Sequence, residues 1–282
     1  MTDKRLKHWL DGLRIAPGEQ PELSRRDCAG KPRRLSRAKA QEETEAAVGD
    51  LDRLQYLLYA DAGASLLIVL QGLDAAGKDG TIRHVMTGMN PQGVRVTPFK
   101  QPTPDEAGHD FLWRVHRAVP GRGEVAIFNR SHYEDVLVVR VHKLVPEEAW
   151  RARYDEINHF EALLAASGTR ILKFFLHLSA QEQLDRFARR LEDPARQWKI
   201  SEADYTERPF WPQYQRAYEE ALSRCSTELS PWYVIPANHK WFRDLTVARI
   251  VVEGLEAMDL RYPEPDIDLA RIRRQYHAAA AK

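Results

Sequence analysis

Residues 65–80 constrain this chain more than any other stretch, and they read Ser-Leu-Leu-Ile-Val-Leu-Gln-Gly-Leu-Asp-Ala-Ala-Gly-Lys-Asp-Gly. The apolar part, residues 66–70, has the length and composition of a strand buried on both faces. Residues 72–78 then match the G-x-x-x-x-G-K pattern of a phosphate-binding loop. Apolar residues recur at helical spacing over residues 80–89. Because the motif requires a strand before it and a helix after it, this order predicts a working phosphate loop.

The loop is expected to bind phosphate through its backbone and one side chain. Glycines allow the chain to curl so that several N–H groups point into one hollow, and the following helix adds its positive end. Lys78 supplies a full positive charge for the outer phosphate oxygens. The residues predicted to contact phosphate here are Gly72, Ala75, Ala76, Gly77, Lys78, Asp79 and Gly80.

Two carboxylates in and beside the loop predict a divalent metal. The residue after Lys78 is commonly Ser or Thr, whose hydroxyl binds Mg²⁺, but here it is Asp79. Asp74 lies inside the loop as well. Carboxylates would repel phosphate unless Mg²⁺ lies between them, since Mg²⁺ binds carboxylate and phosphate oxygens together. Asp79 has an alternative role as a first-turn helix residue favoured by the dipole, which suits Asp74 less because Asp74 precedes the helix.

Composition narrows the class of protein. The 282 residues allow one large α/β domain or two small ones, and 43% hydrophobic with 29% charged residues is an ordinary globular balance. A net charge of +1 gives no overall basic field for nucleic acid. Cys28 and Cys225 have no metal-ligand spacing. The charged N-terminus has no signal core and no apolar run could span a membrane, so we expect a cytoplasmic protein.

Strand and helix patterns alternate along the rest of the chain. Further strands are predicted at residues 93–98, 125–128, 170–178 and 232–236. Helices are predicted at residues 37–60, after Thr103, and at 146–166, 179–191, 207–224 and 242–260. This alternation predicts an α/β fold with one five-stranded parallel sheet covered by helices on both faces. Residues 1–35 are expected to be an N-terminal arm, 36–262 the domain, and 263–282 a C-terminal tail.

The strand at 125–128 ends in a second group of polar residues. Ligands collect at the carboxyl ends of strands in open parallel sheets, and many phosphate-loop enzymes hold Mg²⁺ with an Asp at this place. Here the residue is Asn129, and Arg130 beside it could clamp a phosphoryl group. We therefore predict that Asp74 and Asn129 hold the metal, directly or through water.

Arginines on the helix at 179–191 suggest a lid. Arg186 and Arg190 are four residues apart and so share one helix face. Mobile helical hairpins that carry arginines close over the phosphates in phosphoryl-transfer enzymes, and we predict such a lid at about residues 184–206. For Arg189 a solvated helix face is the alternative.

The helix at 207–224 carries Trp211, Tyr214 and Tyr218 at helical spacing. Such a stripe is more often part of the core than a platform for a nucleotide base, and the core is the favoured interpretation.

These residues together point to phosphoryl transfer, in which the protein positions the reactants and neutralises charge. Lys78, Arg130, Arg186 and Arg190 would surround the transferred group. One alternative is a non-catalytic nucleotide-binding module, since a phosphate loop can serve binding alone. A second is an ATP-dependent nucleoside monophosphate kinase on the same scaffold.

Four segments resemble the polyphosphate kinase 2 family. Residues 72–80 are similar to its phosphate loop, including the Asp after the Lys, and 128–136 (Phe-Asn-Arg-Ser-His-Tyr-Glu-Asp-Val) to its second motif. Residues 186–199 resemble its lid, and 236–241 (Pro-Ala-Asn-His-Lys-Trp) its last strand end. The similarity covers about residues 30–262. Together these motifs are highly specific, whereas the loop alone would not be.

The resemblance implies a thymidylate-kinase-like fold, dependence on Mg²⁺, and inorganic polyphosphate as phosphoryl donor to nucleotides. It places Asp74, Lys78, Asn129, Arg130, Arg186 and Arg190 at the reaction centre. Polyphosphate is a dense anion, so a basic channel is expected, for which the candidates are Lys78, Arg83, Lys100, Arg130 and Lys199. Family members usually form dimers or tetramers. Adenine nucleotides are the expected acceptors, and the sequence leaves guanine nucleotides open.

Asn129 departs from the Asp that many family members have at this position. An Asn followed by Glu134 and Asp135 resembles the subgroup that phosphorylates both AMP and ADP. With Arg130, these two acidic residues are the predicted nucleotide-binding residues. The exchange removes a negative charge beside the phosphates and weakens one metal ligand.

Overall fold

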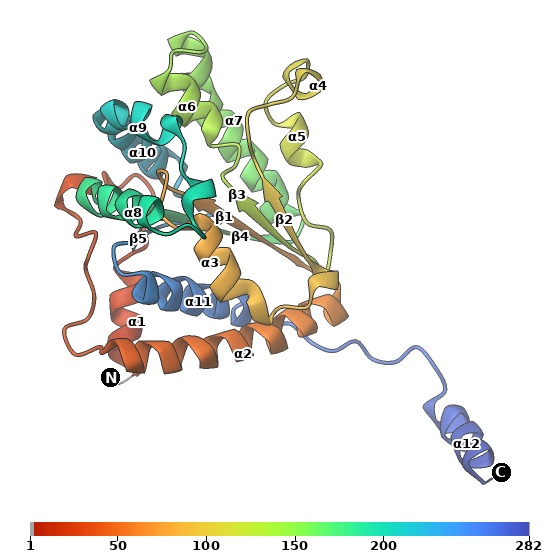
Figure 1. Ribbon diagram of the computed structural model, residues 1–282. Coiled ribbons are helices and arrows are strands. Elements are labelled where there is room, and N and C mark those ends of the chain that lie inside the picture. Colours follow the sequence, from red (N-terminus) through yellow and green to blue (C-terminus); the bar gives the residue numbers. More distant parts are fainter. Residues whose placement is uncertain (1–2, 282) are drawn as a thin grey trace.

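A single parallel sheet with strand order β2-β3-β1-β4-β5 forms the centre of the computed structural model, which describes residues 3–281 (Figure 1). The strands are β1 (Ser65–Gln71), β2 (Val94–Pro98), β3 (Val125–Asn129), β4 (Thr169–His177) and β5 (Trp232–Pro236). Every neighbouring pair is parallel, which confirms the predicted sheet.

Helices cover both faces of this sheet. The helices of the described residues are α1 (Asp3–Asp11), α2 (Arg37–Asp61), α3 (Lys78–Val85), α4 (Pro104–Ala107), α5 (Trp113–His116), α6 (Glu134–Val141), α7 (Glu147–Ala166), α8 (Ala180–Glu192), α9 (Glu202–Thr206), α10 (Trp211–Cys225), α11 (Lys240–Glu256) and α12 (Leu269–Ala280). Helices α1, α2, α3 and α11 pack on one face, and α6, α7 and α10 on the other. No helix between residues 3 and 281 is both long and apolar enough to cross a bilayer.

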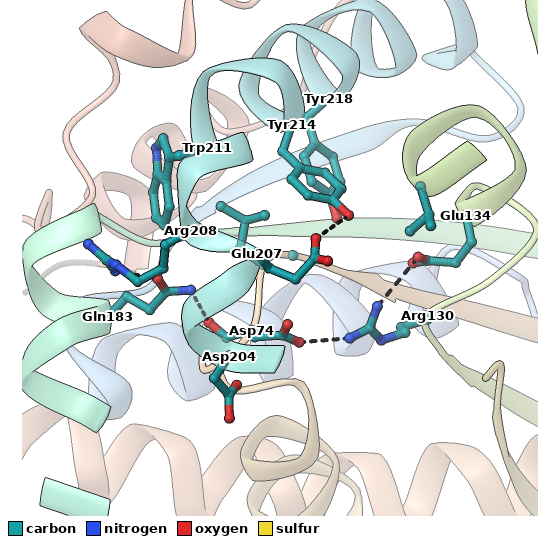
Figure 2. Close-up of a pocket in the computed structure, with 13 residues that line it drawn as sticks. Asp74, Arg130, Glu134, Gln183, Asp204, Glu207, Arg208, Trp211, Tyr214 and Tyr218 are labelled. Carbon is teal, nitrogen blue, oxygen red and sulfur yellow. Dashed lines mark hydrogen bonds and ion pairs between the residues drawn. The ribbon is translucent and has the colours of Figure 1, made fainter. Parts of the chain in front are cut away.

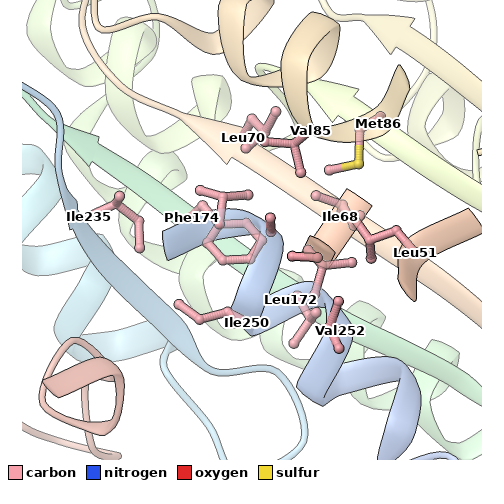
Figure 3. Close-up of a cluster of buried hydrophobic side chains, with 14 of the residues drawn as sticks. Leu51, Ile68, Leu70, Val85, Met86, Leu172, Phe174, Ile235, Ile250 and Val252 are labelled. Carbon is pink, nitrogen blue, oxygen red and sulfur yellow. The ribbon is translucent and has the colours of Figure 1, made fainter. Parts of the chain in front are cut away.

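Strand β1 is buried along its whole length, as its apolar sequence predicts. Its alternate residues serve opposite faces: Ile68 and Leu70 join the cluster under α2 and α11, while Leu67 and Val69 join the other. Figure 3 shows the first cluster, in which Ile250 of α11 lies near the sheet residue Phe174. Burial on both sides therefore fixes the strand that carries the phosphate loop.

The N-terminal arm is built into this body. Leu6 and Leu10 of α1 belong to the core cluster. After α1, the backbone N–H of Ile15 bonds to Trp232 O and the N–H of Val234 bonds to Leu13 O, at 2.9 Å each, so the arm runs antiparallel beside β5.

Several helical segments differ from the sequence prediction. One helix was expected after Thr103; its start is confirmed by a capping box with Glu106, but the chain breaks into α4 and α5. The break follows from Asp110, whose side chain caps the N–H of Leu112 and begins a new turn. Helix α6, directly after the second polar segment, helix α9 in the predicted lid and helix α12 in the C-terminal tail were not predicted.

The sheet register brings the two predicted site segments together. Leu70 of β1 pairs with Asn129 of β3, so the phosphate loop and the segment at Arg130 leave neighbouring strands at the same edge. This edge is the carboxyl end of a parallel sheet, where ligands bind in such folds.

Candidate active site

The phosphate loop joins β1 directly to α3. Its backbone has positive φ at Gly72 (151°), Ala75 (62°) and Gly77 (110°), and Gly77 precedes the first helical residue, Lys78. A left-handed conformation at the non-glycine Ala75 costs free energy, so the surrounding contacts must hold it in place. The loop thus has the curled form that directs N–H groups and the positive helix end to one point.

Lys78 folds back over this loop. Its Nζ donates to Gly72 O at 2.7 Å and approaches Leu73 O at 3.4 Å. Burial, and to a smaller degree the positive charge of Arg130, lower the pKa of Lys78 to about 8. The carboxylates of Asp74, Glu134 and Asp79 oppose this shift. The hydrogen-bond partners of this buried ammonium group are two backbone carbonyls, so a bound phosphate would stabilise its charge.

Two guanidinium groups support the loop from behind. Arg186 of α8 donates to Ala75 O at 2.8 Å and Ala76 O at 3.0 Å, and also to the backbone of residues 237–238. Arg243 of α11 donates to Ala76 O at 3.3 Å and pairs with Asp244 at 2.7 Å. Carbonyl groups held in this way do not turn their negative ends toward a bound anion.

Arg130 faces the loop from the end of β3. Its φ of 62° is left-handed, and its N–H bonds to Leu70 O at 3.0 Å. The guanidinium donates to Asp74 at 2.7 Å and lies 3.4 Å from Glu134, as Figure 2 shows. Burial acts to lower the pKa of Arg130, but Glu134 and Asp74 outweigh it and raise the pKa. These carboxylates fix a full positive charge at the mouth of the loop.

The predicted metal ligands lie at the same edge. Asn129 Nδ2 donates to Asp79 Oδ1 at 2.7 Å, and Asp74 is held by Arg130. Carboxylate and amide oxygens suit Mg²⁺, whose remaining positions are usually filled by water and phosphate oxygens. The donor set therefore fits a divalent cation that binds together with phosphate, although the fit requires the present pairs to open.

A pocket adjoins the loop, formed by α6, α8, α9 and α10 (Figure 2). Tyr214 donates a hydrogen bond to Glu207 at 3.0 Å, and Tyr218 OH lies 3.3 Å from Gln71 Oε1. The lining residues are Gly72, Leu73, Asp74, Arg130, Glu134, Val138, Gln183, Asp204, Glu207, Arg208, Trp211, Tyr214 and Tyr218. Tyr214 and Tyr218 are buried, which confirms that they belong to the core, yet they also line this pocket.

The other predicted site residues lie in different surroundings. Asp135 points to α7, where it pairs with Arg153 at 3.2 Å, and burial raises the pKa of this carboxyl to about 6. Arg190 donates to Lys199 O within the predicted lid. The remaining candidates for the basic channel, Arg83, Lys100 and Lys199, are exposed side chains.

Sequence reasoning missed several residues that the fold adds to the site. Gln183 Nε2 donates to Asp74 O at 2.9 Å, and Arg208 donates to Gln183 Oε1. Glu207 and Arg243 are further additions. Only Arg243 had a signal in the sequence, since it follows the predicted strand-end segment at 236–241.

Residues 65–85 form a strand, a phosphate loop and a helix on a parallel sheet, and Lys78 and Arg130 both lie at this loop. This arrangement defines a phosphotransferase with the P-loop kinase fold. The chain belongs to the polyphosphate kinase 2 family, whose sequence profile matches residues 34–263.

Similar proteins carry consistent names. Over 216 residues the chain is 54% identical to the AMP/ADP-polyphosphate phosphotransferase of Meiothermus ruber, covering 77% of this chain and 81% of that protein. Over 264 residues it is 44% identical to the ADP-polyphosphate phosphotransferase of Rhodopseudomonas palustris, covering 89% and 91%. The crystal structure of polyphosphate kinase 2 from Arthrobacter aurescens TC1 superposes with a TM-score of 0.91 at 39% identity, covering 95% and 96%.

Proposed function

We propose that this chain transfers a phosphoryl group from inorganic polyphosphate to AMP and to ADP, forming ADP and ATP. The observation that carries the proposal is the meeting of the phosphate loop with Arg130, which the parallel register of β1 and β3 produces. The relatives support the donor, since both similar phosphotransferases are named for polyphosphate. The acceptor range follows the relative at 54% identity, whose name includes AMP and ADP.

The chain contributes positioning and positive charge to this reaction. Lys78 binds the phosphate oxygens next to the transferred group, together with the loop N–H groups. Arg130, oriented by Asp74 and Glu134, neutralises charge on the phosphoryl group as it moves between donor and acceptor. Fixed donors of this kind need no reorganisation during the transfer, which is the main source of their effect on rate.

Asp74, Asp79 and Asn129 are the residues that would hold a divalent cation, for which Mg²⁺ is the proposed species. A bound cation would reduce the repulsion between phosphate oxygens and these carboxylates. The exposure of Asp79 leaves it accessible from the phosphate side.

The pocket beside Asp74 is the proposed acceptor site. Its volume of about 40 Å³ is far below the roughly 300 Å³ or more of a site for a small ligand. A nucleotide therefore needs a wider pocket, and the proposed lid is the segment at 184–206, which contributes Asp204 to the lining. Arg190 lies on it, and Arg186 stays proposed as catalytic, although here its donors are taken by backbone carbonyls.

Exposed basic side chains at Arg83, Lys100 and Lys199 are proposed contacts for the polyphosphate chain. We also propose guanine nucleotides as additional acceptors, a cytoplasmic location, and assembly as a homodimer or homotetramer.

The test is ATP formation by the purified protein with Mg²⁺ and long-chain polyphosphate, with AMP or ADP supplied separately and adenylate kinase excluded. We expect ATP from ADP, and ADP followed by ATP from AMP. Product from ADP alone would contradict the broad acceptor range. No product with polyphosphate, but transfer from ATP to a monophosphate, would establish an ATP-dependent monophosphate kinase instead.

A further inference from the structure

The C-terminal helix α12 stands apart from the rest of the chain (Figure 1). None of its residues is buried. A helix of this length is only marginally stable in water unless its apolar face packs on another surface. The helix therefore needs a partner surface.

Helix α12 has the composition of a docking helix. Leu269, Ile272 and Tyr276 recur at spacings of three and four residues and are 45%, 47% and 68% exposed. Arg271, Arg273 and Arg274 flank this stripe, and the helix has no acidic residue. A surface that is partly apolar and acidic would match both features.

Helix α2 presents such a surface along its exposed side. Glu42, Glu45, Gly49, Asp52, Tyr56 and Tyr59 follow one another at spacings of three and four residues. Tyr56 and Tyr59 are 55% and 48% exposed. Within residues 3–281, neither Glu45 nor Asp52 has an ion-pair partner, and the same holds for the arginines of α12. The α2 stripe, defined as these six residues, is thus complementary to α12 in charge, apolar character and spacing.

Gly49 leaves a notch in the α2 stripe, because glycine has no side chain. A Cβ built at Gly49 would meet no atom within 4 Å, so no packing within the chain requires glycine there. Glycine inside a helix costs about 1 kcal/mol relative to alanine. A notch between Glu45 and Asp52 lets a second helix approach closely.

The path of the tail directs α12 away from its own α2. Arg261 N donates to Asp61 Oδ2 at 2.8 Å, and the rings of Tyr262 and Tyr56 are 6.4 Å apart, so the tail leaves at the C-terminal end of α2. Pro263 and Pro265 follow, and proline keeps such a spacer extended. For α12 to pack on the α2 stripe of its own chain, the backbone would have to reverse direction at Pro263 and Pro265, where proline keeps it extended.

We propose that α12 of one copy packs along the α2 stripe of a second copy, with the two tails exchanged about a two-fold axis. Such an exchange is self-complementary, so each dimer contains the contact twice. Leu269, Ile272 and Tyr276 would cover Tyr56 and Tyr59, while the arginines pair with Glu45 and Asp52. The inference does not depend on the proposed reaction.

The first test is the mass of the full chain in solution by light scattering at micromolar concentration. Ile272→Asp with Tyr276→Asp should reduce the mass at least twofold relative to the unmodified chain. Ala278→Asp, on the opposite side of α12, is the matched control and should leave the mass unchanged. A monomeric unmodified chain, or an unchanged mass in the double variant, would overturn the proposal.

A second test distinguishes exchange from folding back. Tyr56→Cys and Tyr276→Cys are made in separate chains, which are mixed and oxidised. A disulfide-linked pair of chains containing one of each is the expected product. Each variant oxidised alone, and the unmodified chain with its buried Cys225 and half-buried Cys28, serve as controls. If only the chain carrying both substitutions forms a disulfide, and forms it internally, α12 packs on its own α2 and the exchange is wrong.

Discussion

Arg243 occupies the space in which a side chain at Gly77 would lie. Its guanidinium reaches from α11 beneath the phosphate loop, and its pair with Asp244 fixes its orientation. Gly77 also has a φ of 110°, which only glycine adopts readily. The loop is thus held from below by a residue far away in the sequence. The left-handed backbone requires glycine at position 77, and a side chain there would displace the Arg243 guanidinium.

Gly77→Ala should therefore lower turnover by about 100-fold or more, because a displacement of about 1 Å in a positioning element has an effect of this size. Steady-state kinetics with polyphosphate and ADP is the measurement. Gly121→Ala is the control, since its nearest neighbour would be 3.5 Å from the new Cβ. Equal losses in the two variants would contradict the requirement for glycine at position 77.

Lys78→Ala should lower turnover by about 100- to 1,000-fold, as the loss of one fixed charge donor does in other enzymes. The same assay measures it, with circular dichroism to verify the fold. Lys39→Ala, at an exposed site on α2, is the control for loss of a lysine. Near-normal turnover of Lys78→Ala would overturn the assignment of the loop.

Asn129→Asp should change the ratio of kcat/KM for AMP and ADP by about fivefold or more. The substitution sets a second carboxylate against Asp79, and one charge a few ångströms from phosphate oxygens is worth about 1 kcal/mol even when well screened. The double variant Asn129→Asp with Asp79→Asn restores an amide–carboxylate pair and should recover part of the original ratio. An unchanged ratio in the single variant would remove Asn129 from acceptor selection.

A buried ion pair lies behind the second motif. Glu161 and Lys173 are 1% and 0% exposed, and Glu161 also accepts a hydrogen bond from Tyr133 OH at 2.8 Å. Burial raises the pKa of Glu161, but Lys173 and His132 outweigh it and hold the pKa at about 2. Because the folded-state pKa lies below the unfolded value of 4.5, the pair stabilises the fold above about pH 4.5, and this stability is lost as the pH falls towards 2.

Glu161→Gln should therefore reduce the free energy of unfolding at pH 7 by about 3–5 kcal/mol, since it leaves the Lys173 ammonium buried without its carboxylate. It should also weaken the loss of stability between pH 5 and pH 3. Urea unfolding at several pH values measures both effects, with Glu264→Gln in the exposed tail as control. A variant within 1 kcal/mol of the unmodified chain at pH 7 would show that the pair contributes little.

The sequence by itself determined those features that depend on neighbouring residues. Apolar runs of strand length, glycine spacing and helical periodicity are local properties, so the sheet and the phosphate loop at 72–78 were predicted correctly. The approach of Arg130 to the loop also followed, since carboxyl ends of parallel strands share one edge.

Only the tertiary structure decided which distant side chains complete the site. Arg186 was predicted to face the phosphates; here it supports Ala75 and Ala76 from behind, and its catalytic role stays a prediction. The position of Arg243 under Gly77 depends on how α11 packs against the sheet, and no local pattern encodes that. Long-range contacts are selected by the burial and hydrogen bonding of the whole fold, and for this reason the sequence predicted the loop but not what holds it.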